Sequence, residues 1–170
     1  MKLIEALKKE KDLMRKADDI RGMVHQNHVH YNYETAPYGD RQGTQVKEWI
    51  QAFHDVLAEI LKLRLAVQRT NLETSVDIDL GGKTVSKSIA AWIHRRRFLA
   101  AKECEIWSTL DDKNLKEGRV RQSTDEIQDV KLVRYYDPAE RDDKRELFRS
   151  EPGIIDRTLE VVNATTDLIE

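Results

Sequence analysis

The first seventy residues contain two long stretches in which apolar side chains recur every three or four positions. This spacing places them on one face of a helix, and it predicts helices over about residues 2–30 and 44–70. We expect Thr44 to cap the second helix. The segment 28–43 between them is rich in tyrosine, asparagine and glycine, which is typical of a loop. Two such helices fold back on each other, so we predict an antiparallel helical hairpin over residues 2–70.

A change of period after the second helix indicates β structure. Residues 76–80 alternate apolar and acidic side chains, as in a half-buried strand. The Gly81-Gly82 dipeptide that follows is typical of a two-residue hairpin turn, so we predict a β-hairpin over 75–85. Residues 129–136 are rich in β-branched and aromatic side chains, and a strand there could lie beside the hairpin as a third strand.

Further helical patterns complete the chain. One helix is expected over 86–110, capped by Thr84 or Ser86, and C-terminal helices over 138–168. The sequence Ser-Glu-Pro-Gly at 150–153 predicts a break between the C-terminal helices, because proline lacks an amide donor. The predicted fold class is mainly α, an antiparallel helical bundle with a small β-hairpin or three-stranded β element. A length of 170 residues is typical of one domain, residues 1–170.

Composition narrows the possible partners and compartments. Charged residues make up 35% of the chain and aromatic residues 6%, a profile that favours amphipathic helices. The net charge is −2 and no basic stripe is present, so we expect no nucleic-acid partner. The triplet Arg95–Arg97 fans over about 200° of a helix and forms no flat basic patch.

The lengths of the apolar runs and the number of cysteines indicate where in the cell the protein is found. No run of about 18 apolar residues exists, so we expect no membrane span. The charged start does not resemble a signal peptide. Cys104 is the single cysteine, which excludes an internal disulfide and a cysteine-based zinc site. We therefore expect a cytoplasmic protein, or one that is incorporated into a virion.

A histidine cluster offers the candidate metal ligands. His25, His28 and His30 lie within six residues, and histidine is a common metal ligand near neutral pH. No HExxH or similar signature accompanies them, and histidines in such a loop are more often exposed or at an interface. We predict that they do not form a structural metal site, and we expect no cofactor.

Several charged residues lie near the centres of the apolar stripes, where an unpaired charge would be expensive to bury. They are Glu10, Arg64, Arg96 and Glu103. In an antiparallel hairpin with these helix ends, facing residues have numbers that sum to about 74, which places Glu10 opposite Arg64. We expect a buried ion pair that sets the register of the two helices. The alternative is that one or both side chains extend to solvent along the edge of the stripe.

Three stretches carry a family resemblance: RTNLET at 69–74, GGKTVSKSIA at 81–90 and NATTDLIE at 163–170. With the order of the helices, they resemble the small septicolysin-like proteins of bacteria and phages, a family of unknown function. The resemblance implies a helical bundle with a small β-hairpin, and no established activity. Two of the stretches contain Asn-x-x-Thr where a helix ends. The residues involved, which we interpret as helix caps, are Asn71, Thr74, Asn163 and Thr166.

Two functional hypotheses follow. The first is a non-enzymatic, self-associating structural or assembly protein, such as a virion or mobile-element component. It is favoured because catalytic signatures are missing and because apolar side chains lie outside the main stripes, namely Phe98 and the tyrosines Tyr31, Tyr33 and Tyr38. The alternative is a metal- or small-ligand-dependent enzyme on a helical bundle that uses His25, His28 and His30. Bundles host such sites with Glu-x-x-His on facing helices, which this sequence lacks.

Overall fold

The computed structural model describes residues 1–121 and 127–169. Its packing divides the chain into two compact units. The first comprises Met1–Ser75 and Glu160–Glu170, and the second comprises Val76–Leu159. This division concerns packing, not independent folding, so a single domain over residues 1–170 stays a prediction.

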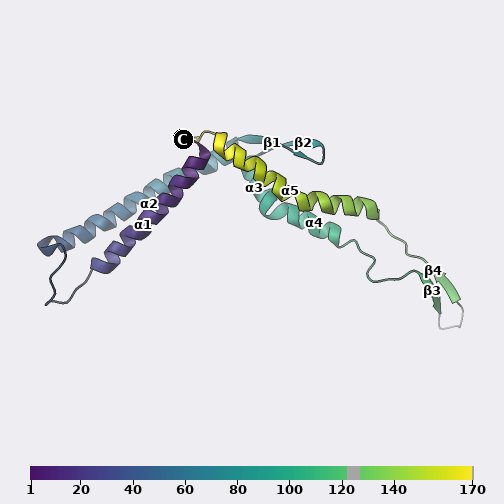
Figure 1. Ribbon diagram of the computed structural model, residues 1–170, viewed down its shortest axis with the longest axis horizontal. Coiled ribbons are helices and arrows are strands. Elements are labelled where there is room, and N and C mark those ends of the chain that lie inside the picture. The colour runs from purple at the N-terminus through teal and green to yellow at the C-terminus, as the bar shows by residue number, and fades with distance from the viewer. Residues whose placement is uncertain (122–126, 170) are drawn as a thin grey trace. The chain divides into compact units, whose positions relative to one another are not determined.

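The first unit is the predicted helical hairpin. Helices α1 (Leu3–Asn27) and α2 (Gln42–Glu73) lie side by side and antiparallel (Figure 1). Each buries one stripe, which consists of Leu3, Ala6, Leu13, Ala17 and Ile20 in α1 and of Val56, Ile60, Leu63, Val67 and Thr70 in α2. The C-terminal segment closes the open end, where Leu3 N donates to Thr166 O at 2.9 Å.

The start of α2 differs from the prediction. The helix begins at Gln42 rather than at Thr44, and a short 3₁₀ turn, Gly39–Arg41, precedes it. The Gln42 side chain stabilises this start, because its amide donates to Asn27 O at 2.6 Å and its carbonyl accepts from Tyr38 N at 3.1 Å. The expected cap, Thr44, is therefore wrong, and Gln42 links the start of α2 to the end of α1 by a hydrogen bond.

The second unit opens with the predicted hairpin. Strands β1 (Ser75–Leu80) and β2 (Lys83–Ser88) pair across Gly81 and Gly82 (Figure 1). Both glycines have positive φ, +60° and +79°, which is the geometry that a tight two-residue hairpin turn requires. The following helix is capped by Ser88, whose Oγ accepts from Ala91 N at 3.3 Å. The predicted caps, Thr84 and Ser86, are wrong because both residues belong to β2.

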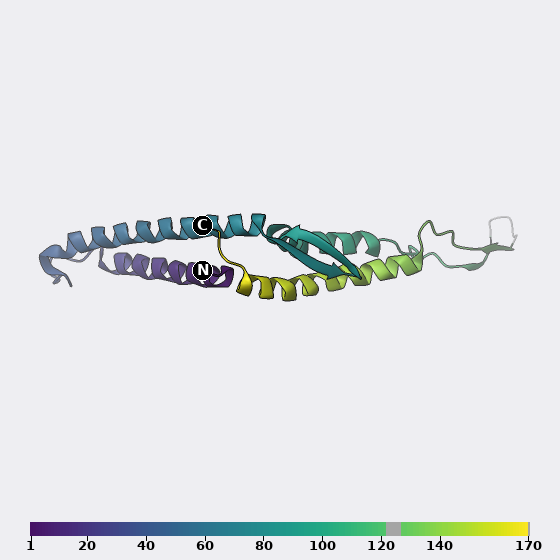
Figure 2. The same ribbon diagram turned by 90° about the horizontal axis from the view of Figure 1, so that it is seen from above.

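Two helical stretches of the second unit pack together. The first runs from α3 (Ile89–His94) through a π-helical segment, Arg95–Leu99, into α4 (Ala100–Ser108). The other is α5 (Pro138–Thr165), and α4 lies beside it (Figure 2). The predicted break at 150–153 is wrong, since α5 continues through Pro152. Glu151 and Ile155 are fully buried there, so packing outweighs the hydrogen bond that proline cannot make.

A second, separate β element lies beyond α4. Strands β3 (Gly118–Arg121) and β4 (Ile127–Val130) pair antiparallel, with Gly118 opposite Val130. The predicted strand over 129–136 is therefore wrong in its bounds, and it does not join β1 and β2 as a third strand. Val133 and Tyr135 are exposed, so residues 131–136 have no buried face that would favour a strand.

The predicted class, mainly α with a small β element, is confirmed. Within residues 1–121 and 127–169, no helix has both the length and the apolar composition that a bilayer crossing needs.

Candidate functional site

The most deeply buried charged side chain of the described residues is that of Glu151 in α5, which is 1% exposed. Arg95 binds it with two nitrogens: Nε donates to Oε1, and Nη2 donates to Oε2 at 2.8 Å. The same guanidinium donates from Nη1 and Nη2 to the two oxygens of Glu103, at 3.0 and 2.9 Å. These three residues, the Arg95 clamp, join the π-helical segment and α4 to α5.

The π-helical segment explains how one arginine meets both glutamates. In a regular α-helix, residues eight apart, such as Arg95 and Glu103, point about 80° apart. A wider turn takes up one extra residue, which brings the two onto one face within about 20°. Phe98 and Leu99, which belong to this segment, are exposed. Such π segments are frequent at functional sites.

The hydrogen bonds of the clamp favour the charged forms of Arg95 and Glu103. Hydrogen bonds to Glu103 and Glu151 raise the pKa of the Arg95 guanidinium above its already high ordinary value. The hydrogen bonds from Arg95 lower the pKa of the Glu103 carboxyl below its ordinary value of 4.5. The Phe148 ring lies 5.7 Å from the guanidinium carbon, within cation–π range. A guanidinium cannot act as a general acid near neutral pH, so the clamp suits a structural role rather than proton transfer.

An open groove beside the clamp contains the single cysteine. Cys104, Ser108, Phe148 and Pro152 line it. Within the described residues, the one hydrogen-bond partner of the Cys104 thiol is the carbonyl of Arg145, at 3.8 Å. No base contacts this sulfur there, so the geometry does not support nucleophilic catalysis by Cys104.

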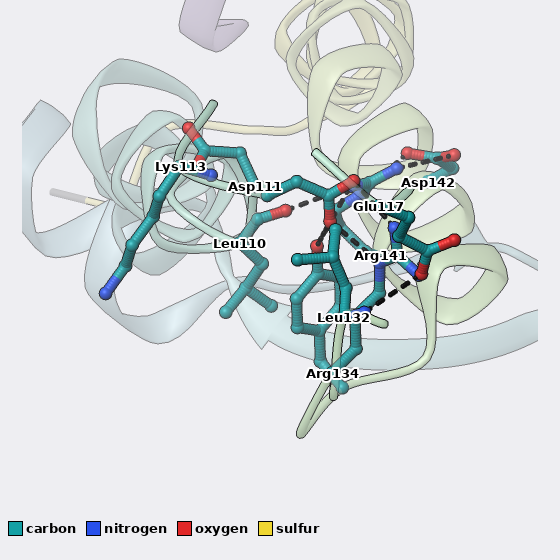
Figure 3. A network of polar contacts seen from close by, with 10 residues as sticks. Leu110, Asp111, Lys113, Glu117, Leu132, Arg134, Arg141 and Asp142 are labelled. Atoms are coloured by element: carbon teal, nitrogen blue, oxygen red, sulfur yellow. Dashed lines mark hydrogen bonds and ion pairs between the residues drawn. The ribbon is translucent and has the colours of Figure 1, made fainter. Parts of the chain in front are cut away.

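A second polar network joins the loops that lead to and from β3 and β4 (Figure 3). Asp112 accepts from Nε and Nη2 of Arg134, both at 2.7 Å, and these bonds hold the pKa of its carboxyl below the ordinary value. Arg141 of α5 donates to Leu110 O at 2.9 Å. Leu132 N donates to Glu117 at 3.0 Å. These side-chain contacts, rather than hydrogen bonds between strands, fix the position of the segment after β4.

The predicted histidine cluster does not converge on one point. The rings of His25 and His28 are 5.9 Å apart, and Nδ1 of His28 lies 2.9 Å from the carbonyl oxygen of His25 at the end of α1. His30 is exposed in the loop. In the described part of the chain, no three His, Cys, Asp or Glu residues are placed to hold a metal ion. That the three histidines bind no structural metal stays a prediction.

The predicted pairing of Glu10 with Arg64 is present. Arg64 Nε lies 2.6 Å from Glu10 Oε1. The helix ends behind the prediction differ, because α1 ends at Asn27 and α2 begins at Gln42, whose numbers sum to 69 rather than 74. The expected burial is wrong, because the Arg64 side chain is 52% exposed and the Glu10 side chain 21%. Arg96 pairs with Asp156, and Glu103 belongs to the Arg95 clamp. Arg96 and Glu103 are both half-buried rather than buried. The long side chains of these residues extend toward solvent, so their charged groups lie outside the buried stripes.

Sequence reasoning missed Glu151 and Arg95. Glu151 fell in the expected helix break, so it was assigned no face. In a continuous helix it shares a face with Ile155 and Leu159, four and eight residues later. A carboxylate inside that apolar stripe is the same signal that identified Glu10, and it would have marked Glu151.

The predicted Asn caps are also wrong. Asn71 lies inside α2 and Asn163 inside α5, and the described non-glycine residues with positive φ are Lys113 and Asn114. Thr74 does end α2, in an extended conformation, and its N–H donates to Thr70 O. Thr166 follows α5, and its N–H donates to Val162 O. Because the chain leaves α2 directly into β1, no left-handed turn is needed there.

The comparisons with known proteins show the fold alone. No family model matches the chain, and no curated protein matches it. A crystal structure of a functionally unknown conserved protein from Corynebacterium diphtheriae is similar, with a TM-score of 0.56 and 20% sequence identity. The similarity covers 99% of this chain and 98% of that chain. None of this bears on the septicolysin-like resemblance, which stays a prediction.

Proposed function

We propose that this chain is a non-enzymatic structural protein that acts by self-association. One observation carries the proposal: α2 has a second apolar stripe that is not part of the core. Its members, each between 42% and 67% exposed, are Ile50, Leu57, Leu61, Leu65 and Leu72. They occupy an arc of about 80°, centred about 140° from the buried stripe of the same helix. Exposed apolar side chains that recur along one face of a helix are typical of interaction surfaces.

The exposed aromatic residues support the same proposal. Phe98 is 57% exposed, and Tyr31 and Tyr33 are 67% and 79% exposed with their rings stacked 5.3 Å apart. Tyrosine is enriched in protein interfaces because it combines a large apolar area with a polar end. The enzyme alternative has no comparable support, since the described residues bring no metal ligands together around the three histidines.

Light scattering coupled to size exclusion tests the proposal across the micromolar range. We expect a mass that is a multiple of 19.8 kDa and that falls on dilution. Leu61→Ser should lower the associated fraction without changing the fold, because Leu61 is 59% exposed. Leu115→Ser is the matched control, since Leu115 is 61% exposed but lies outside α2. A monomer at every concentration would contradict the proposal.

A further inference from the structure

The exposed face of α2 has the spacing of a coiled-coil seam. Its positions follow intervals of four and three, and all six are exposed: His54, Ala58, Leu61, Leu65, Gln68 and Leu72. Apolar side chains at such intervals pack into the holes of a facing helix. The polar side chains at two of the six positions restrict which registers a partner helix can adopt. These six positions are called the α2 seam.

The charges along one flank of the α2 seam are ordered. At intervals of seven residues, this flank presents Glu48, Asp55, Lys62 and Arg69, which are two acids followed by two bases. The other flank presents Ile50, Leu57, Arg64 and Asn71. In coiled coils, charges at the flanking positions decide partner choice and helix orientation. The order of charges on the first flank can therefore identify the occupant.

From this order we propose that the α2 seam binds α2 of a second copy of the chain, with the two helices antiparallel. The inference rests on the proposed self-association and specifies its partner and orientation. In an antiparallel pair, the charged flank of one helix lies against the same flank of the other. Residues whose numbers sum to about 117 then meet, which pairs Asp55 with Lys62 and Glu48 with Arg69 of the second copy. The two-fold symmetry produces each pair twice.

A parallel pair of the same helices has no such complementarity. There, each flank lies against the opposite flank of the second copy, offset by about five residues. Arg64 would meet Arg69, Asp55 would meet Ile50 and Lys62 would meet Leu57. Repulsion between like charges and the lack of any attractive pair disfavour this arrangement.

The present contacts of the two acidic residues of the flank leave them accessible. Asp55 accepts a hydrogen bond from Gln51 at 2.8 Å, and Glu48 lies 3.7 Å from Arg41. The residues involved are exposed, and exposed contacts of this kind contribute little to stability. They can therefore be exchanged for contacts with a second copy at small cost.

A charge exchange in the full-length chain tests the orientation. The variants are Asp55→Lys, Lys62→Asp and the double exchange, with Asp18→Lys on α1 as a control for net charge. Each single variant replaces two attractive pairs by two repulsive ones, so we expect dimerisation about tenfold weaker at low salt. The double variant, and an equal mixture of the two single variants, should recover the wild-type affinity, because residue 55 again meets an opposite charge at residue 62. Sedimentation equilibrium measures these affinities, and circular dichroism checks that each variant is folded.

Each result has a defined meaning. A wild-type dimer that responds to Asp55→Lys no more than to Asp18→Lys overturns the α2 seam and leaves self-association intact. Weakening by both single variants without recovery in the double variant overturns the antiparallel pairing. A wild-type monomer throughout overturns the proposed function together with the seam.

Discussion

Removal of the cation from the Arg95 clamp should destabilise the second unit more than the loss of any other single ion pair described above. In Arg95→Met, a side chain of similar length keeps much of the packing but donates no hydrogen bonds. Glu151 is 1% exposed, so its carboxylate would remain buried after losing both hydrogen bonds from the guanidinium. Water cannot replace the lost partner without opening the contact between α5 and the π-helical segment.

The size of the effect follows from the unequal exposure of the two glutamates. Breaking a buried ion pair by removing one partner costs about 3–5 kcal/mol, because an uncompensated charge is left behind. Glu103 is 42% exposed, so its share of the clamp is screened by solvent, and Glu103→Gln should cost less than about 1 kcal/mol. Nearly all of the loss in Arg95→Met should therefore come from Glu151. A double variant, Arg95→Met with Glu151→Met, should recover part of the loss because it removes both buried charges.

Urea unfolding monitored by tryptophan fluorescence measures this loss. Trp92 and Trp107 lie in the second unit and Trp49 lies in the first, so a Trp49→Phe background reports on the second unit. Trp92 is a suitable probe because it is fully buried and its Nε1 donates to Val76 O at 2.9 Å. The change in the free energy of unfolding is obtained from the shift in the urea midpoint at unchanged slope.

Arg96→Met is the matched comparison, since it removes an arginine of the second unit from an ion pair with Asp156, which is 58% exposed. A loss in Arg95→Met no larger than the loss in Arg96→Met would refute the reasoning. So would a double variant, Arg95→Met with Glu151→Met, that is less stable than Arg95→Met alone.

Three further predictions follow from the same contacts. A double-mutant cycle with Glu10→Gln and Arg64→Met should give a coupling under about 1 kcal/mol, because the pair is partly exposed, and a coupling near 3 kcal/mol would contradict its geometry. The pKa values of the Glu103 and Asp112 carboxyls are lowered on folding, so these groups contribute stability above about pH 4.5, and this contribution is lost as the pH falls through their folded pKa values. Between pH 7 and pH 3, the urea midpoint of Glu103→Gln should therefore decrease less steeply than that of the wild type. Elemental analysis of purified protein should find less than about a tenth of an equivalent of zinc, and stoichiometric zinc that disappears in His28→Ala would show that the prediction for the three histidines is wrong.

The sequence alone determined the features that depend on local pattern. The periods of the apolar positions predicted the two long helices, and the two glycines predicted the turn between β1 and β2. The contact between Glu10 and Arg64 was also predicted, because both are charged positions inside apolar stripes of two antiparallel helices, although the predicted helix ends were two or three residues off. The helices and the turn follow from interactions between neighbours along the chain, and the Glu10–Arg64 contact follows from the antiparallel packing of two adjacent helices.

Tertiary structure decided the features in which a local preference is overridden. Proline at 152 disfavours a helix, yet α5 continues because Glu151 and Ile155 are buried on its packed face. The π-helical segment had no signature in the sequence, and in the structure it accompanies the contacts of Arg95 with Glu103 and Glu151. The partner of β4 is local, since paired residues of β3 and β4 lie six to twelve positions apart, and the sequence analysis missed it because it assigned no strand between residues 110 and 129. The contact of Arg95 with Glu151 joins residues 56 positions apart, and its energy is gained only when α5 packs against the π-helical segment, which no local pattern determines.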